Sequence, residues 1–250
     1  MERGTEPRQV GLARALSKLG FCSRSQAARL IRAGRVRLNG ATRRDPETPV
    51  HLQRDRIEVN GNAVTAESRI YLALNKPRGA ITTASDEKGR QTVYSLLDEK
   101  LPWIGPVGRL DKASEGLLLL TNDSEWAARI SDPGSHLDKT YHVRVGALAG
   151  EILAEKLVRG VVADGELLRA KQARVLRGGE KNSWLEIVLD EGKNRQIRRM
   201  FETLGIEVLR LIRVTIGPLA LGTLAKGKSR ALTAAEKLAL DQAVKISREM

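Results

Sequence analysis

Several residue types that mark other classes of protein are scarce in this sequence. A single cysteine, Cys22, excludes an internal disulfide and fits a reducing cytoplasm. Only eight of the 250 residues are aromatic, so a core must be built mainly from Leu, Val, Ile and Ala. The three histidines, His51, His136 and His142, lack metal-ligand spacing, and we therefore expect no bound metal.

Long hydrophobic runs are also missing. No apolar stretch approaches the roughly 20 residues that cross a bilayer, and the N-terminal residues lack the apolar segment of a signal peptide. We therefore expect a cytoplasmic protein without a membrane partner. The sequence contains neither a phosphate-cradling glycine loop nor a dinucleotide fingerprint, so we expect no cofactor.

Positive charge, by contrast, is abundant. The formal net charge is +13 and the pI is about 10.2. A protein this basic usually binds a polyanion, and nucleic acid is the commonest one. Residues 8–66 contain twelve Arg or Lys and four Asp or Glu, a net charge of +8, so the first quarter of the chain carries well over half of the excess.

This first quarter is predicted to form a small domain of two helices and a few short strands. Leu12, Leu16 and Leu19 recur at the spacing of one helical face. Ser23–Gln26 reads as a capping box that opens a second helix. Asn39-Gly40 is a hairpin turn signal after a short alternating strand.

Arg24, Arg29 and Arg32 lie off the apolar stripe of the second helix. They could form an ordinary solvated surface, or they could bind RNA, because the guanidinium fork matches the oxygens of a phosphate. Residues 23–31, 34–36 and 38–40 (SRSQAARLI, GRV and LNG) resemble the alpha-L RNA-binding domain. That domain occurs in ribosomal small-subunit protein four and in many RNA-modifying enzymes. The resemblance implies an RNA-binding domain over residues 8–66.

A second, larger domain is predicted to follow a small, polar linker at residues 60–69. Apolar or alternating stretches indicate strands, and Ile197, Phe201 and Leu204 mark an amphipathic helix. The predicted strands cover residues 70–74, 116–121, 141–145 and 184–189. Thr233–Glu236 is a capping box for a last helix. Because strands and helices do not alternate as βαβ units, we predict an α+β fold over residues 70–243.

Two segments contain residues that could take part in catalysis or ligand binding. Asp111 follows Gly108-Arg109-Leu110 and precedes a buried run of leucines, where an aspartate is more often a turn cap than a catalyst. Arg195, Arg198 and Arg199 lie at a predicted helix start, where positive charge opposes the helix dipole. We therefore expect an anion, either a phosphate or a carboxylate, near that helix start.

Together these segments resemble a known enzyme family. Residues 108–123 (GRLDKASEGLLLLTND) are similar to the signature of the ribosomal RNA pseudouridine synthases of the RsuA family. Four more segments of that family follow in the expected order, at residues 74–79, 139–141, 191–200 and 211–217. Ser124 departs from the family, which often has glycine there. The resemblance implies a mixed, mainly antiparallel sheet flanked by helices, and an enzyme that isomerises uridine in RNA to pseudouridine.

The resemblance also implies roles for individual residues. Asp111 would be the nucleophile, Arg198 would pair with it, and Tyr141 would stack on the uracil. Substrate-binding residues would include Arg109, which would fill the space left by the flipped base. Ile197 and Leu211 would line the pocket with apolar surface, and Lys76 and Lys139 would touch phosphates or shape the pocket. The RNA-binding domain would add Arg24, Arg29 and Arg32.

Several alternatives stay open at the level of the sequence. The substrate could be large-subunit ribosomal RNA, which residues 209–214 favour, small-subunit ribosomal RNA or tRNA, free or in a partly assembled subunit. The chain could also be a non-catalytic RNA-binding assembly factor, although Asp111, Tyr141 and Arg198 are all present. A methyltransferase would require a glycine-rich cofactor loop, which residues 77–79 do not form. We expect a monomer with a mobile first domain.

Overall fold

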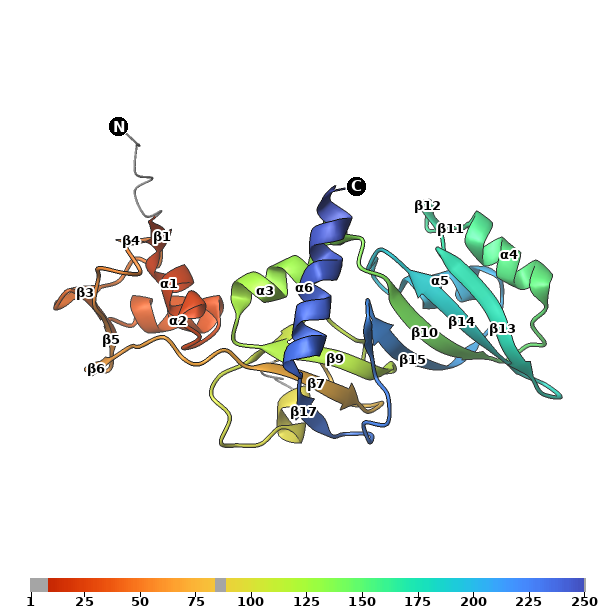
Figure 1. The fold of residues 1–250 in the computed structure, drawn as a ribbon, viewed down its shortest axis with the longest axis horizontal. Coiled ribbons are helices and arrows are strands. Elements are labelled where there is room, and N and C mark those ends of the chain that lie inside the picture. Colours follow the sequence, from red (N-terminus) through yellow and green to blue (C-terminus); the bar gives the residue numbers. More distant parts are fainter. Residues whose placement is uncertain (1–8, 84–88, 250) are drawn as a thin grey trace. The chain divides into compact units, whose positions relative to one another are not determined.

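The computed structural model describes residues 9–83 and 89–249 (Figure 1). It divides into two compact units, one containing the chain up to Tyr71 together with residues 98–105 and 120–127, and the other containing the rest. Among the helices of the described residues, none has the length and hydropathy of a membrane span.

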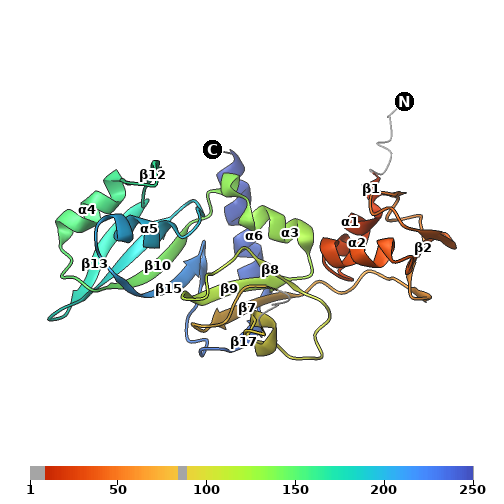
Figure 2. The same cartoon turned by 180° about the vertical axis from the view of Figure 1, so that it is seen from behind.

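The first unit begins with two short helices that pack against each other (Figure 2). The elements here are β1 Val10–Gly11, α1 Leu12–Lys18, α2 Arg24–Arg32, β2 Val36–Leu38, β3 Ala41–Arg43, β4 Pro49–Val50, β5 Ile57–Val59 and β6 Asn62–Ala63. Strands β3, β2, β5 and β6 form one sheet, and β1 pairs with β4. Leu12, Leu16 and Ile31 are fully buried between the helices and strands, as their spacing predicts.

The local signals in this unit form the structures that we predicted. Ser23 accepts a hydrogen bond from the backbone N–H of Gln26, and the Gln26 side chain accepts one from the backbone of Ser23. This reciprocal pair is the predicted capping box of α2. Asn39 and Gly40 both have positive φ, at 52° and 81°, and they turn β2 into β3.

The second unit is built on a nine-stranded sheet whose main order is β13-β14-β10-β15-β9-β7-β17, with β16 on β15 and β8 on β9. The bounds are β7 Tyr71–Lys76, β8 Gly105–Val107, β9 Glu115–Thr121, β10 Lys139–Val145, β13 Gln172–Gly178, β14 Ser183–Leu189, β15 Val208–Ile216, β16 Leu219–Ala220 and β17 Ser229–Ala231. Most pairs are antiparallel, but β9 and β15 run parallel. Together with the helices described in the next paragraph, this sheet forms the predicted mixed α+β architecture.

Two helices, α4 Glu151–Arg159 and α5 Gln196–Thr203, and a small hairpin pack on the sheet's β13-to-β15 half. The other helices are α3 Ser124–Ser131 and α6 Ala234–Glu249, with 3-10 turns at Val93–Leu96 and Pro133–Ser135. Residues of α4, of α5 and of the hairpin β11 Val161–Ala163 and β12 Glu166–Leu168 form one core with inward residues of β10 and β14. Figure 1 shows α4 beside β13. Thr233 and Glu236 exchange the hydrogen bonds of the predicted capping box before α6.

Two predicted strands are longer than their hydrophobic patterns indicate. The strand predicted at residues 70–74 continues to Lys76, and the strand predicted to begin at Tyr141 begins at Lys139. For β10, pairing with β14 and β15 extends the ladder over the polar Lys139 and Thr140. Near the end of β7, the backbone of Asn75 donates to Lys228 and accepts from Gly227. This extension matters for function, because both lysines belong to the predicted site.

The polar segment 60–69, where we predict the domain boundary, is anchored near its end. The backbone N–H of Glu67 donates to the carbonyl of Leu19 at 3.0 Å. The Asn122 side chain donates to the carbonyl of Ser68 at 2.8 Å and accepts from the N–H of Ile70 at 2.9 Å. These bonds, all within the first unit, argue against the flexible connection that its composition suggests.

Candidate active site

A cavity of about 290 Å³ opens in the second unit. It is lined by the loop between β8 and β9, by β10 and β15, and by the residues that lead into α5. Six predicted site residues, which are far apart in the sequence, meet there, namely Arg109, Asp111, Lys139, Tyr141, Ile197 and Leu211. Ile197 and Leu211 are buried apolar walls, whereas Arg109 is exposed.

The loop that carries Asp111 is fixed through its backbone. Each of the five carbonyl groups from Leu110 to Ser114 accepts a hydrogen bond. The donors are Thr82 Oγ1 to Leu110 at 2.8 Å, Lys76 Nζ to Asp111 at 3.0 Å, Gly79 N to Lys112 at 2.8 Å, Arg198 Nη2 to Ala113 at 3.1 Å and Lys76 Nζ to Ser114 at 2.8 Å. The carboxylate of Asp111 is left for other chemistry, since no side chain of the described residues forms a hydrogen bond or ion pair with it.

Lys76 was expected either to touch a phosphate of the substrate or to shape the pocket. It is fully buried and does not belong to the cavity lining, which favours the second role. Its ammonium donates to the carbonyls of Asp111 and Ser114, and also to that of Pro77 at 3.2 Å. Burial lowers the pKa of Lys76 to about 8, although the negative charges of Asp111 and Glu115 oppose that shift. Lys76 is therefore a positioning residue for the Asp111 loop.

Arg198 also differs from its predicted arrangement. We expected an ion pair with the Asp111 carboxylate, but none joins the two side chains among the described residues. The guanidinium of Arg198 instead donates to the carbonyls of Ala113 and Val208. Burial and the neighbouring Arg195 lower the pKa of Arg198, and the charge of Asp111 opposes this. Arg198 therefore holds the Asp111 loop and acts on its carboxylate at longer range.

Comparison with known proteins identifies the family. The family model described as RNA pseudouridylate synthase matches residues 70–203, which is more than half of the chain. The chain belongs to this family. A second model, the S4 domain, matches residues 10–57 of the synthase, from β1 to the first residue of β5. Both findings confirm the resemblance that the sequence motifs indicate, and the synthase therefore acts on RNA.

Individual relatives agree with this assignment. The synthase is 40% identical to ribosomal large subunit pseudouridine synthase B of Bacillus subtilis over 225 residues, covering 89% of this chain and 91% of the relative. It is also 40% identical to an uncharacterized RNA pseudouridine synthase of Rickettsia prowazekii, over 86% of this chain and 91% of that one. A crystal structure of a pseudouridylate synthase superimposes with a TM-score of 0.66 at 31% identity, covering 92% of this chain and 99% of the other.

The structure adds Arg213 of β15 and Lys193 to the synthase site, two residues that motif reading missed. Arg195, which the sequence indicated as a cation near an expected anion, lines the same cavity. Arg213 could have been noticed in the sequence, because it is a charged residue between the apolar Leu211 and Ile216 of one strand. The shape of the loop before α5 could not be predicted, because it depends on Arg195, whose φ of 48° is left-handed.

The arginines predicted to bind RNA in the S4 domain of the synthase are available to a ligand. Arg24, Arg29 and Arg32 are all exposed on α2, whereas Ala27 and Ile31 of the same helix are buried. No ion pair engages these three side chains within the described residues. The helix therefore presents three exposed cations that no acid of the described residues neutralises in an ion pair.

Proposed function

We propose that the synthase converts a uridine of large-subunit ribosomal RNA to pseudouridine, with Asp111 as its nucleophile. The observation that carries this proposal is the free carboxylate of Asp111 in a cavity, on a loop whose five carbonyls are all hydrogen-bonded. A fixed backbone places a reactive group with little entropic cost. The similarity to large subunit pseudouridine synthase B of Bacillus subtilis supports the choice of RNA.

The isomerisation detaches uracil from ribose, rotates it, and joins its carbon 5 to the sugar carbon. Asp111 would assist the first step, either by attacking the sugar carbon as the glycosidic bond breaks or by removing a sugar proton. The reaction ends when the hydrogen on carbon 5 of uracil leaves as a proton. Neither a redox change nor an energy source is needed for this balance.

The cavity walls suit an unstacked base. Ile197 and Leu211 offer apolar surface on two sides, and the Tyr141 ring would stack on the uracil while its hydroxyl relays a proton. Because a paired uridine is out of reach inside a helix, the target must flip out of the stack. We infer that Arg109, exposed at the mouth of the cavity, fills the vacated position.

The test is tritium release from ribosomal RNA transcripts labelled at carbon 5 of uracil. We expect release from large-subunit RNA, either free or in partly assembled large subunits. Release from small-subunit RNA alone would move the substrate to the other subunit. An absence of release from all of these RNAs, with RNA binding retained, would contradict the proposal and favour a non-catalytic assembly factor.

We propose that α2 binds RNA phosphates through Arg24, Arg29 and Arg32. Replacing all three with Gln should lower the magnitude of the slope of log affinity against log salt by about 2 to 3, because fewer phosphate contacts form and fewer counterions are released on binding. Filter binding across a series of KCl concentrations measures this slope. A matched triple variant at Arg159, Arg174 and Arg177, which lie in the second unit, should keep the wild-type slope. Equal slopes for the two triple variants would refute a role for α2.

The location and assembly of the protein belong to the same proposal. We infer a cytoplasmic monomer with an RNA-binding domain over residues 8–66 and a catalytic domain over residues 70–243. The ribosomal RNA substrate and the buried, lone Cys22 support the cytoplasm. Cell fractionation and sedimentation of the purified chain measure both properties.

A further inference from the structure

Arg213 is an unusual residue for the wall of a catalytic cavity. It lies on β15 opposite Tyr141 of β10, and only 6% of its surface is exposed. Its Nε donates to the carbonyl of Leu117 at 2.7 Å. Its Nη2 is buried and has no hydrogen-bond partner among the described residues. A buried guanidinium that lacks partners is costly, so such an atom indicates a missing acceptor.

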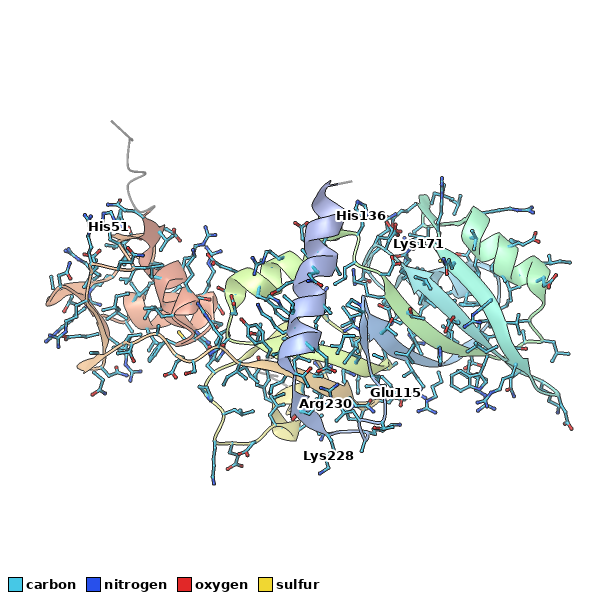
Figure 3. The ribbon with its side chains drawn as sticks, viewed as in Figure 1. His51, Glu115, His136, Lys171, Lys228 and Arg230 are labelled. Carbon is cyan, nitrogen blue, oxygen red and sulfur yellow. The ribbon has the colours of Figure 1, made fainter. Side chains whose placement is uncertain are left out.

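The acids near Arg213 are engaged elsewhere. Glu115, labelled in Figure 3, accepts from Arg210 at 2.8 and 3.0 Å and pairs with Lys226 at 2.6 Å. Asp138 precedes Lys139 in the chain, but both of its carboxylate oxygens accept from Lys171 at 2.8 Å. Neither carboxylate forms an ion pair with Arg213 or Lys139 among the described residues.

The cavity lining consequently carries an excess of positive charge. Among the described residues that line it, the cations are Arg109, Lys139, Lys193, Arg195 and Arg213, and the one acid is Asp111. Lys193 is paired with Glu166 and Glu191, but no ion pair involves the other four cations in the described parts of the chain. Burial and the charge of Arg213 lower the pKa of Lys139, although the negative charges of Asp138 and Asp190 oppose that shift.

The start of α5 adds to the attraction for an anion. Arg195 is its N-cap residue and provides no side-chain cap to the first helical turn. Helix N-termini carry partial positive charge and favour a bound phosphate or carboxylate. The residues at this helix start line the same cavity as Arg213 and Lys139.

We propose that Arg213 and Lys139 form a binding subsite for one phosphate of the RNA backbone next to the target uridine. The proposal rests on the proposed function, because it takes RNA as the occupant of this cavity. A guanidinium and an ammonium together provide the donors that a phosphate oxygen pair accepts, and a single phosphodiester would relieve their mutual repulsion. In this role both residues bind substrate, and they set the position of the ribose relative to Asp111.

The experiment measures RNA binding rather than turnover. In the full-length chain carrying Asp111→Asn, affinity for a large-subunit ribosomal RNA transcript is determined by filter binding across a series of KCl concentrations. Arg213→Gln and Lys139→Gln should each lower the salt slope by about 0.7 to 0.9, the value for one lost phosphate contact. Arg213→Lys should retain the slope, because it keeps the charge.

The matched control is Arg159→Gln, which removes the same charge from an exposed position on α4 and should leave the slope unchanged. Thermal melting checks folding, and Lys139→Gln carries the test if Arg213→Gln does not fold. Wild-type slopes for the folded Gln variants would overturn the phosphate subsite. Arg213 would then be a structural residue that hydrogen-bonds to β9 through the carbonyl of Leu117. This outcome is independent of tritium release, so it is distinct from a failure of the proposed function.

Discussion

Asp111→Asn is expected to reduce tritium release from ribosomal RNA by roughly four orders of magnitude or more, since a nucleophile and the groups that serve it act as a unit. The amide keeps the shape of the side chain but carries no charge and is a poor nucleophile. The hydrogen bonds that hold the loop are accepted by its backbone carbonyls and not by the Asp111 carboxylate, so the loop backbone should stay in place in the variant. Steady-state kinetics on the transcript that gives release with the wild type measure this effect.

Asp98→Asn is a suitable control for this loss. Asp98 lies outside the cavity, and its side chain accepts a hydrogen bond from the N–H of Lys100, which an asparagine oxygen can also accept. We expect wild-type activity for this variant. If Asp111→Asn melted normally, bound RNA normally and kept a tenth of the activity, the assignment of Asp111 as nucleophile would be wrong.

Lys76→Met should damage both stability and catalysis. Methionine fills a similar volume but leaves the carbonyls of Pro77, Asp111 and Ser114 without their donor in a buried place. We expect a loss of about 2–4 kcal/mol in the free energy of unfolding near neutral pH. Because a small displacement of a reactive group is costly, kcat should also fall by about 100-fold.

Chemical denaturation and steady-state kinetics measure these two effects. Lys112→Met is the matched control, since Lys112 is an exposed lysine on the same loop. This control should stay within about 0.5 kcal/mol of the wild type. A folded Lys76→Met variant with wild-type kcat would show that the loop holds Asp111 without the buried ammonium.

The stability difference between wild type and Lys76→Met should also depend on pH. The pKa of Lys76 is about 8 in the folded chain, below the ordinary value of 10.5, so the unfolded chain binds more protons between these values. Wild-type stability should therefore rise relative to Lys76→Met as the pH increases from 8 to 10.5. The full change is about 3 kcal/mol, since one pKa unit corresponds to about 1.4 kcal/mol. A gap that narrows over this range would contradict the lowered pKa.

Local sequence signals predicted much of the fold because they act over a few residues. The capping boxes at Ser23 and Thr233 and the turn at Asn39 depend on neighbouring backbone groups, and all three form as expected. The register between β9 and β15 could not be predicted in this way. It depends on Gly116, which has a φ of 99° and lies close to the backbone of Arg213. These two residues are about 100 positions apart in the sequence.

The site was predictable to a similar degree. Motifs indicated Asp111 and Tyr141, and the structure brings both into one cavity. The same motifs did not reveal that Lys76 and Arg198 bind the loop through its carbonyls, because backbone acceptors have no signature in the sequence. The role of Arg213 was missed for a related reason. Arg213 has no ion pair among the described residues because Glu115 binds Arg210 and Asp138 binds Lys171, and these pairings cannot be predicted from the sequence.

The anchoring of residues 67–70 by Asn122 has a consequence for protein engineering. A chimera that exchanges the S4 domain for another RNA-binding module would ordinarily be joined within the polar stretch 60–69. In such a chimera Leu19 is removed with the S4 domain, so the bond from the Glu67 N–H is lost, whereas Asn122 can still hold the backbone of Ser68 and Ile70. Chimeras should therefore be joined before Ser68 and should keep Asn122, so that the donor module is connected to a backbone that the recipient still fixes.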